Sequence, residues 1–224
     1  GTGIQVDANS HSSNLGTISI GSGNGYLVKK DGTAVNDLSG VIILSGRGYG
    51  AYVEDGGYFT NLGTISYDST KGGDCSNTSV GGTCEDASAK EEKAGTESAN
   101  SMLYIEDGAV FVNRGMLNMS GAALDFDTGG RYVLASGGSY QADSLSGEVT
   151  VGSDVVMNGF EDTYTEENAF TGQNNGLSLT SESYMFDADL NRNGDTADVT
   201  LTRKSFADLV KDEDLAQFLE ANYH

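Results

Sequence analysis

The sequence predicts an all-β solenoid, in which short strands stack in successive coils. The main observation is a repeated motif of strand, Asp-Gly corner, strand and Asn/Gly corner. Two full copies span residues 51–67 and 103–119, a looser copy spans 26–44, and a truncated copy spans 14–20. The 32 glycines and the absence of proline and tryptophan favour many tight corners over long helices.

The spacing of the repeat gives the size of a coil. Its marker asparagines fall at 14, 36, 61 and 113, so the steps are 22, 25 and 52 residues. A solenoid coil takes roughly 20–30 residues, because it must make a few strands and corners and bury its inward face against its neighbours. The third step therefore predicts one coil plus an insertion.

Short apolar runs bounded by Gly, Asn, Asp and Ser predict the strands of these coils. In residues 1–67 the expected strands are 4–6, 17–20, 26–28, 41–44, 51–53, 58–60 and 64–67. In residues 102–160 they are 103–105, 110–112, 116–119, 132–135 and 148–151. Strands this short need coil-to-coil pairing, so both segments are expected to be β-helix coils.

Residues 68–101 interrupt the pattern with an acidic, Ser- and Gly-rich segment that has almost no apolar residues. Such a segment cannot offset its ordering entropy by burial, so an inserted, exposed loop is expected. Cys75 and Cys84 lie within it, with no His or further Cys nearby to complete a metal set. They favour a local disulfide, with free thiols or a metal site as the alternatives.

Residues 161–204 are expected to cap the solenoid. Residues 161–176 are polar and predict a loop, and strands are expected at 177–180, 184–190 and 198–203. Asn193-Gly194 suits a tight hairpin turn between the last two. Residues 205–224 predict a helical tail, with a capping box at Ser205 and Asp208 and a possible second helix from Asp212.

Thirty-three acidic residues against 12 basic ones give a net charge of −21, which argues against nucleic-acid partners and anionic membrane surfaces. The sequence contains no run of 18 apolar residues, so direct insertion into a membrane as a helix is not expected. The chain begins inside its own repeat pattern, without a signal-peptide pattern, and is expected to be an excised piece of an exported protein.

The order of motifs resembles bacterial autotransporter passenger domains. Repeated Asn-x-Gly-Thr-Ile strands lead to Gly-Gly-Arg-Tyr-Val at 129–133, to Asp-Ser-Leu-Ser-Gly-Glu-Val-Thr-Val at 143–151, and to Asp-Val-Thr-Leu-Thr-Arg-Lys at 198–204 before a helix. The resemblance is to the C-terminal part of a passenger, ahead of a linker and an outer-membrane barrel. It is especially close to passengers that carry a subtilisin-like protease or an esterase.

The resemblance implies a right-handed parallel β-helix with an autochaperone-like C-terminal cap, secreted or displayed on the bacterial surface. The expected role is a non-catalytic stalk that nucleates folding and presents an adhesive or effector region. The alternatives are the scaffold of an upstream protease or esterase, and an adhesin that self-associates or binds glycans. The implied partners are the barrel of the same polypeptide and a host protein, a glycan or a second copy.

No catalytic residues are expected in this chain. The two histidines are His11, in a polar corner, and His224, at the last position, and no nucleophile motif accompanies them.

No cofactor is predicted, and calcium is the one candidate ligand that the sequence offers. Oxygen ligands alternate along the segment 187–198, at Asp187, Asp189, Asn191, Asn193, Asp195 and Asp198. Neither register places both the glycine and the twelfth carboxylate of a calcium loop, so a polar hairpin is the favoured interpretation.

The repeats also carry aromatic residues, including Tyr52, Tyr58, Tyr67, Tyr104 and Phe111. They could form an exposed stripe that binds sugar or protein. Stacking from coil to coil, in the core or as a ladder, is the favoured interpretation.

Overall fold

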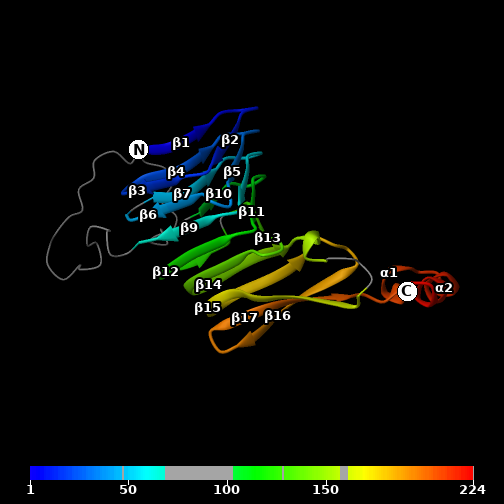
Figure 1. Cartoon of the computed structure of the whole chain (residues 1–224). Helices are drawn as coiled ribbons and strands as arrows, with labels where there is room; N and C mark the ends of the chain where they lie inside the picture. The colour runs from blue at the N-terminus through cyan, green and yellow to red at the C-terminus, as the bar shows by residue number, and fades with distance from the viewer. Residues whose placement is uncertain (47, 69–102, 128, 157–160, 224) are drawn as a thin grey trace.

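The computed structural model describes residues 1–46, 48–68, 103–127, 129–156 and 161–223. The chain forms a mostly β structure of the parallel solenoid type, followed by an antiparallel hairpin and short helices (Figure 1). The solenoid predicted from the repeat is confirmed at this level. Cys75, Cys84 and most of the expected insertion at 68–101 lie outside the described residues, so the disulfide stays a prediction.

Each of the early coils contributes three strands. The first holds β1 (Thr2–Val6), β2 (His11–Asn14) and β3 (Thr17–Ile20); the second β4 (Gly23–Val28), β5 (Thr33–Asn36) and β6 (Val41–Leu44); the third β7 (Gly48–Val53), β8 (Tyr58–Asn61) and β9 (Thr64–Tyr67). The next coils hold β10 (Leu103–Ile105), β11 (Val110–Asn113) and β12 (Met116–Asp125), then β13 (Arg131–Leu134) and β14 (Ser139–Val151). Equivalent strands of successive coils pair in parallel, so one curved sheet runs β2-β5-β8-β11-β13 and another path runs β3-β6-β9-β12-β14.

The long third step of the repeat is one coil plus an insertion, as predicted. β8 pairs directly with β11, and Asn61 stands opposite Asn113. β2 and β5 were not predicted as strands. β2, His-Ser-Ser-Asn, has no apolar residue, and β5 is little longer than one alternation, so neither has a clear hydrophobic signal. Both form strands because each pairs in parallel with the equivalent strand of the next coil, β2 with β5 and β5 with β8.

The first corner of each coil is a four-residue turn. In the first four coils the fourth residue donates its N–H to the carbonyl oxygen of the first at 2.7–3.0 Å, as in Gly57 to Glu54 and Ala109 to Glu106. The third residue has a positive φ, which Gly adopts without strain and Asn or Asp adopts more readily than other residues. These positions are Asn9, Asp31, Gly56 and Gly108. The repeated Asp-Gly signal therefore marks a repeated backbone turn.

Apolar side chains fill the solenoid and stack along its axis. Phe59 and Phe111 are fully buried and stack with ring centroids 5.7 Å apart, and Tyr26 meets Phe59 edge-on at 5.1 Å. The stack continues through Tyr132, Phe126, Tyr140 and Phe170. This column makes the core continuous from the second coil to the C-terminal strands.

A second buried column is polar. Asn14, Asn36, Asn61 and Asn113 are the four buried polar residues among those described, and they occupy equivalent positions of β2, β5, β8 and β11. Each amide donates to the next, with N–O distances of 2.8–2.9 Å between neighbours. The marker asparagines of the repeat therefore form a hydrogen-bonded ladder inside the protein.

The loop predicted for 161–176 is wrong, because residues 163–176 belong to the long strand β15 (Thr163–Ser181). The first part of β15, residues 163–171, pairs in antiparallel register with β17 (Thr196–Arg203), and the second part, 170–181, pairs in parallel with β14, so most of its backbone is hydrogen-bonded to a neighbouring strand. Many of its polar side chains are exposed while Tyr164, Ala169, Phe170 and Leu177 face inward, which hides the strand from a hydrophobicity pattern.

A hairpin of β16 (Phe186–Asn193) and β17 completes the C-terminal end, with Gly194 at positive φ in its turn. The expected cap strands are thus present, and β15–β17 cover the edge that β14 would otherwise expose (Figure 1). A 3₁₀ turn, η1 (Ser153–Val155), precedes β15.

The predicted helical tail forms two short helices, α1 (Phe206–Leu209) and α2 (Glu213–Ala221). Ser205 caps the first and Asp212 the second, each accepting a hydrogen bond from the backbone N–H three residues on. The break expected at Asp212 is confirmed. Within the described residues no helix is long and apolar enough to cross a membrane.

Glu182, which follows β15, contacts residues of the coil formed by β13 and β14, and these contacts make the stability of the fold depend on pH. Its carboxylate accepts from the backbone N–H and hydroxyl of Ser153 and pairs with Arg131 at 3.0 Å. The hydrogen bonds from Ser153, and then Arg131, lower the pKa of Glu182. A lowered pKa stabilises the fold above the ordinary Glu value of about 4.3, and this stability is lost as the pH falls below it.

We therefore expect Glu182→Gln to lower the melting temperature at pH 6 and to have a smaller effect at pH 3. Thermal unfolding at both pH values measures this, with the exposed Glu167→Gln as the control. An equal loss at both pH values would show that the charge of Glu182 contributes nothing.

Candidate functional site

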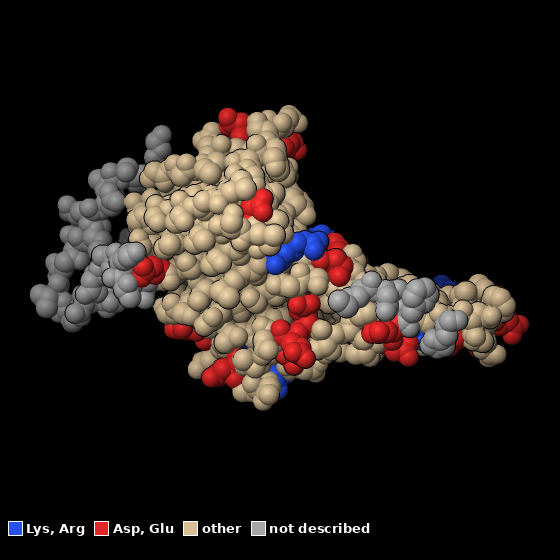
Figure 2. All heavy atoms as spheres, viewed as in Figure 1, with Lys and Arg blue, Asp and Glu red and all other residues tan. Residues whose placement is uncertain are grey.

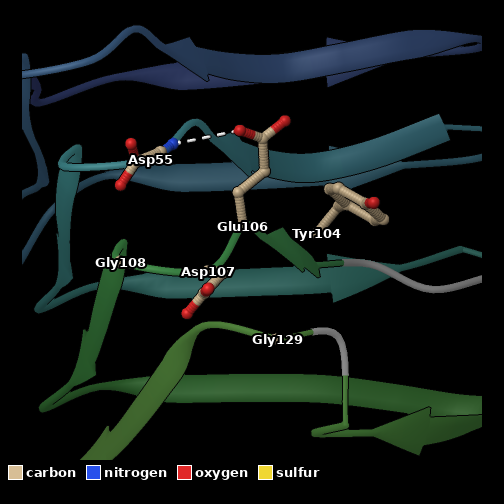
Figure 3. A pocket seen from close by; sticks show the side chains of 6 residues that line it. All are labelled: Asp55, Tyr104, Glu106, Asp107, Gly108 and Gly129. Carbon is tan, nitrogen blue, oxygen red and sulfur yellow. Dashed lines mark hydrogen bonds between the residues drawn. The ribbon is translucent and has the colours of Figure 1, made fainter.

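The strongest candidate for a binding site is an open depression on the outer surface, where the sheet β1-β4-β7-β10 ends. Its volume is about 500 Å³, and Asp55, Tyr104, Glu106, Asp107, Gly108 and Gly129 line it (Figure 3). They come from the corner after β7, from β10 and the corner after it, and from the segment before β13. The long 68–101 segment separates the first two corners in sequence, and coil stacking places them next to each other.

A stack of half-buried tyrosines leads to the depression along the outer face of β7 and β10. Tyr52 and Tyr104 are register partners, with ring centroids 4.9 Å apart and an interplanar angle of 25°. Tyr49 packs against both rings, at 5.8 Å and 5.4 Å. β10 is the last strand of this sheet, and among the described residues no ring extends the stack beyond Tyr104. The end of the aromatic stack thus forms one wall of the depression.

Hydrogen bonds hold the Glu106 carboxylate in place. The Tyr52 hydroxyl donates to Glu106 Oε1 at 2.6 Å. The Asp55 backbone N–H donates to Oε2 at 3.0 Å, the bond drawn as a dashed line in Figure 3. Burial, and then the bond to Glu106, raise the pKa of Tyr52, so its hydroxyl stays protonated and remains a donor. The site therefore presents a fixed carboxylate beside an aromatic ring.

Gly108 allows the two corners to approach closely. It has a φ of +83°, and a Cβ built on it would lie 2.2 Å from the Asp55 carboxylate oxygen. Any larger residue would displace Asp55 as well as strain the turn. The glycine of the repeat thus sets the spacing of the carboxylates as well as the turn.

The same row of corners contains both signs of charge. In the second coil the corner carries Lys29 and Lys30, whose ammonium groups lie 2.6 Å from Glu54 and 3.6 Å from Asp55. The corner of the fourth coil carries Glu106 and Asp107, and none of the described lysines or arginines forms an ion pair with either. Carboxylates are also spread widely over the face seen in Figure 2. The depression is locally anionic on a protein of net charge −21.

The predicted aromatic residues divide between core and surface. Phe111 is buried in the inner column, Tyr52, Tyr67 and Tyr104 are half-buried, and Tyr58 is 41% exposed. Coil-to-coil stacking, the favoured interpretation, holds for Phe111 with Phe59 and for Tyr52 with Tyr104. Tyr49 and Glu106 were not singled out from the sequence. Aligning the corners Glu54-Asp55-Gly56 and Glu106-Asp107-Gly108 would have indicated Glu106.

The six calcium candidates lie along the terminal hairpin. Asp187, Asp189, Asn191 and Asn193 alternate along β16, Asp195 is in the turn, and Asp198 is on β17 opposite Asn191. Asp187 pairs with Lys204 at 3.0 Å, and Asp198 accepts the backbone N–H of Asn168 at 2.7 Å. Over the described residues no group of three or more His, Cys, Asp or Glu is arranged to hold a metal ion. Calcium binding stays a prediction, tested by whether calcium raises the melting temperature.

Of the two histidines, His11 is exposed at the start of β2, and His224 lies outside the described residues.

Taken together, the fold and the depression define a parallel β-solenoid protein with an aromatic and acidic surface site. Comparisons with protein-family models, with curated proteins and with solved structures found no match.

Proposed function

We propose that this chain is a non-catalytic stalk of a secreted or surface-displayed bacterial passenger domain, and that its C-terminal end nucleates folding. In this proposal the solenoid is a right-handed parallel β-helix, and it presents an adhesive or effector region away from the cell. The barrel of the same polypeptide would be its partner in export. The resemblance of 129–133, 143–151 and 198–204 to autotransporter passengers is what suggests this setting.

The single observation that carries the stalk proposal is the continuity of the two inner columns. The aromatic column and the asparagine ladder each link coil to coil, and the aromatic column runs on into the strands of the C-terminal cap. An elongated support needs such repeated nearest-neighbour contacts, because each coil is stabilised chiefly by the one next to it.

The cap supports the proposed folding role. β16 and β17 form an antiparallel hairpin joined by a short turn, and these local contacts form at lower loop-closure cost than parallel coil pairing. β15 pairs with β17 in antiparallel register and completes the cap. Val199 and Leu201 of β17 are fully buried, so the cap has apolar contacts of its own. A folded cap would then provide an edge on which β14 and the earlier coils assemble.

Refolding kinetics test this order of events. Val199→Ala in the cap and Val28→Ala in the second coil each remove two methyl groups from a fully buried site, at a cost of about 2 kcal/mol. If the cap nucleates folding, Val199→Ala raises the activation free energy of refolding by most of that amount, so refolding slows. Val28→Ala mainly speeds unfolding. Stopped-flow refolding measures both, and the reverse assignment would remove the folding role from the cap.

A second function, adhesion, is favoured by the outward tyrosine stack. A stalk needs no aromatic rings on its outer surface, yet Tyr49, Tyr52 and Tyr104 lie together beside an open depression. Adhesion and support are compatible, since one coil can serve both.

A further inference from the structure

We propose that the depression beside Tyr104 binds the side-chain cations of a lysine-rich polypeptide. The ammonium group would lie against the Tyr104 ring and pair with the carboxylates of Glu106 and Asp107. This goes beyond the stalk function and does not depend on it. It follows from the composition of the wall: the described residues that line it supply one aromatic ring, three carboxylates and two glycines, and none of these described residues is basic.

The aromatic wall is the first argument. A tyrosine ring attracts a cation placed over its face, because the ring carries negative charge density there. Tyr104 is the terminal ring of the stack among the described residues and lines the depression, so no other described ring covers its second face. Stacking on Tyr52 and Tyr49 also holds the Tyr104 ring in place, so little side-chain entropy is lost on binding.

The chain itself supplies the second argument. At the equivalent corner of the second coil, Lys29 and Lys30 bind the carboxylates of the third-coil corner, Glu54 and Asp55. The next corner again carries Glu and Asp, at 106 and 107, but the coil before it offers acids where the second coil offers lysines. An external ammonium group at this corner would repeat an interaction that the solenoid already makes one coil earlier.

The third argument is preorganisation and field. The Tyr52 hydroxyl and the Asp55 N–H fix the Glu106 carboxylate before any ligand arrives. Charge-assisted hydrogen bonds to a fixed carboxylate are among the stronger polar contacts. The net charge of −21 adds a long-range attraction that speeds encounter with a polycation and repels polyanions.

A labelled tetralysine peptide, titrated into the intact protein and followed by fluorescence anisotropy at low salt, tests the proposal. Tyr104→Ala leaves the net charge unchanged and is expected to weaken binding about threefold to fivefold, whereas Tyr104→Phe, which keeps the ring, is expected to bind nearly as well. Tyr58→Ala removes an exposed tyrosine elsewhere and serves as the matched control.

The carboxylates are tested by a charge-matched pair of variants. Glu106→Gln with Asp107→Asn is expected to weaken binding by about tenfold, and Glu167→Gln with Asp195→Asn, at exposed sites, much less, although both pairs remove two charges. Asp107→Asn alone leaves the Glu106 hydrogen bonds intact and is expected to weaken binding by a smaller factor.

Three results would overturn the proposal. Equal losses from both charge-matched pairs, with no effect of Tyr104→Ala, would show attraction by net charge alone. Absence of tetralysine binding would remove the site. Binding of a neutral oligosaccharide such as maltohexaose in place of tetralysine would assign the depression to sugars. None of these results bears on refolding order, so the stalk proposal is tested separately.

Discussion

Asn61→Ala is expected to destabilise the protein by about 3–4 kcal/mol. Asn61 is fully buried, donates to Asn113 Oδ1 at 2.9 Å and to the Met116 carbonyl at 3.2 Å, and accepts from Asn36 Nδ2 at 2.8 Å. Alanine leaves polar atoms of two neighbouring coils without this partner, in a space that it does not fill. Each buried group left unsatisfied costs about 1–3 kcal/mol, which exceeds the net contribution of the bonds themselves.

Equilibrium urea unfolding measures the effect, and a fall in melting temperature of about 10 °C should accompany it. Asn14→Ala is the matched variant at the end of the ladder, where one asparagine neighbour is lost and the residue is 7% exposed. We expect about half the loss there. Asn175→Ala, at an exposed position of β15, should be nearly neutral. Equal losses at Asn61 and Asn14 would contradict the cooperative ladder.

The ladder also explains why the sequence carries the coil register so clearly. A buried amide that must meet the amide of the next coil tolerates no shift by one residue, since a shift turns every side chain to the other face. Repeats of Asn at 14, 36, 61 and 113 are therefore visible without a structure, and the doubled step could be resolved into a coil and an insertion. Corner glycines add to the signal, because Gly63 has the Gly40 carbonyl oxygen 2.2 Å from where its Cβ would lie.

Strands without an apolar pattern could not be predicted in this way. β2 is held by backbone pairing with β5 and the first half of β15 by pairing with β17, and their side chains are largely polar. Pairing with a partner distant in sequence leaves no local signature, so a polar strand and a polar loop have the same sequence pattern. Parallel pairing with β5 of the next coil stabilises β2, and antiparallel pairing with β17 stabilises the first half of β15, which is why these segments form strands at all.

The depression could not be predicted from the sequence either, for a different reason. The aromatic residues were predicted to stack, and Tyr52 does stack on Tyr104. What could not be foreseen is that the sheet β1-β4-β7-β10 ends at β10, since residues 126–130 still carry the Gly-Gly signal of a corner. The termination of one sheet, while the others continue to β13 and β14, exposes the last ring and the last acidic corner.

Arg203→Leu is expected to detach the helical tail, with a local loss of about 3 kcal/mol. The side chain is 8% exposed and joins three segments: its guanidinium bonds Asp162 before β15, Glu220 of α2 and the Lys204 carbonyl oxygen. It also lies over the rings of Tyr223 and Phe206, at 4.3 Å and 5.5 Å from their centroids. Hydrogen bonds to Glu220, then to Asp162, raise the pKa of Arg203 above its ordinary value, so the group stays charged at every accessible pH.

A lysine at this position keeps the charge, but it cannot bond two carboxylates with one planar group while stacking on two rings. We therefore expect Arg203→Lys to recover less than half of the loss.

Hydrogen exchange followed by mass spectrometry measures the local effect. Protection of peptides covering 206–223 should fall by roughly 100-fold in Arg203→Leu, since each factor of ten corresponds to about 1.4 kcal/mol. Peptides from β4–β9 should keep their protection, because no bond of Arg203 reaches them. Arg192→Leu, at an exposed arginine of β16, is the control. A uniform loss of protection along the chain would mean that the tail and the solenoid unfold as one unit, and Arg203 would then be a core residue of the whole protein, with no separate role in holding the tail.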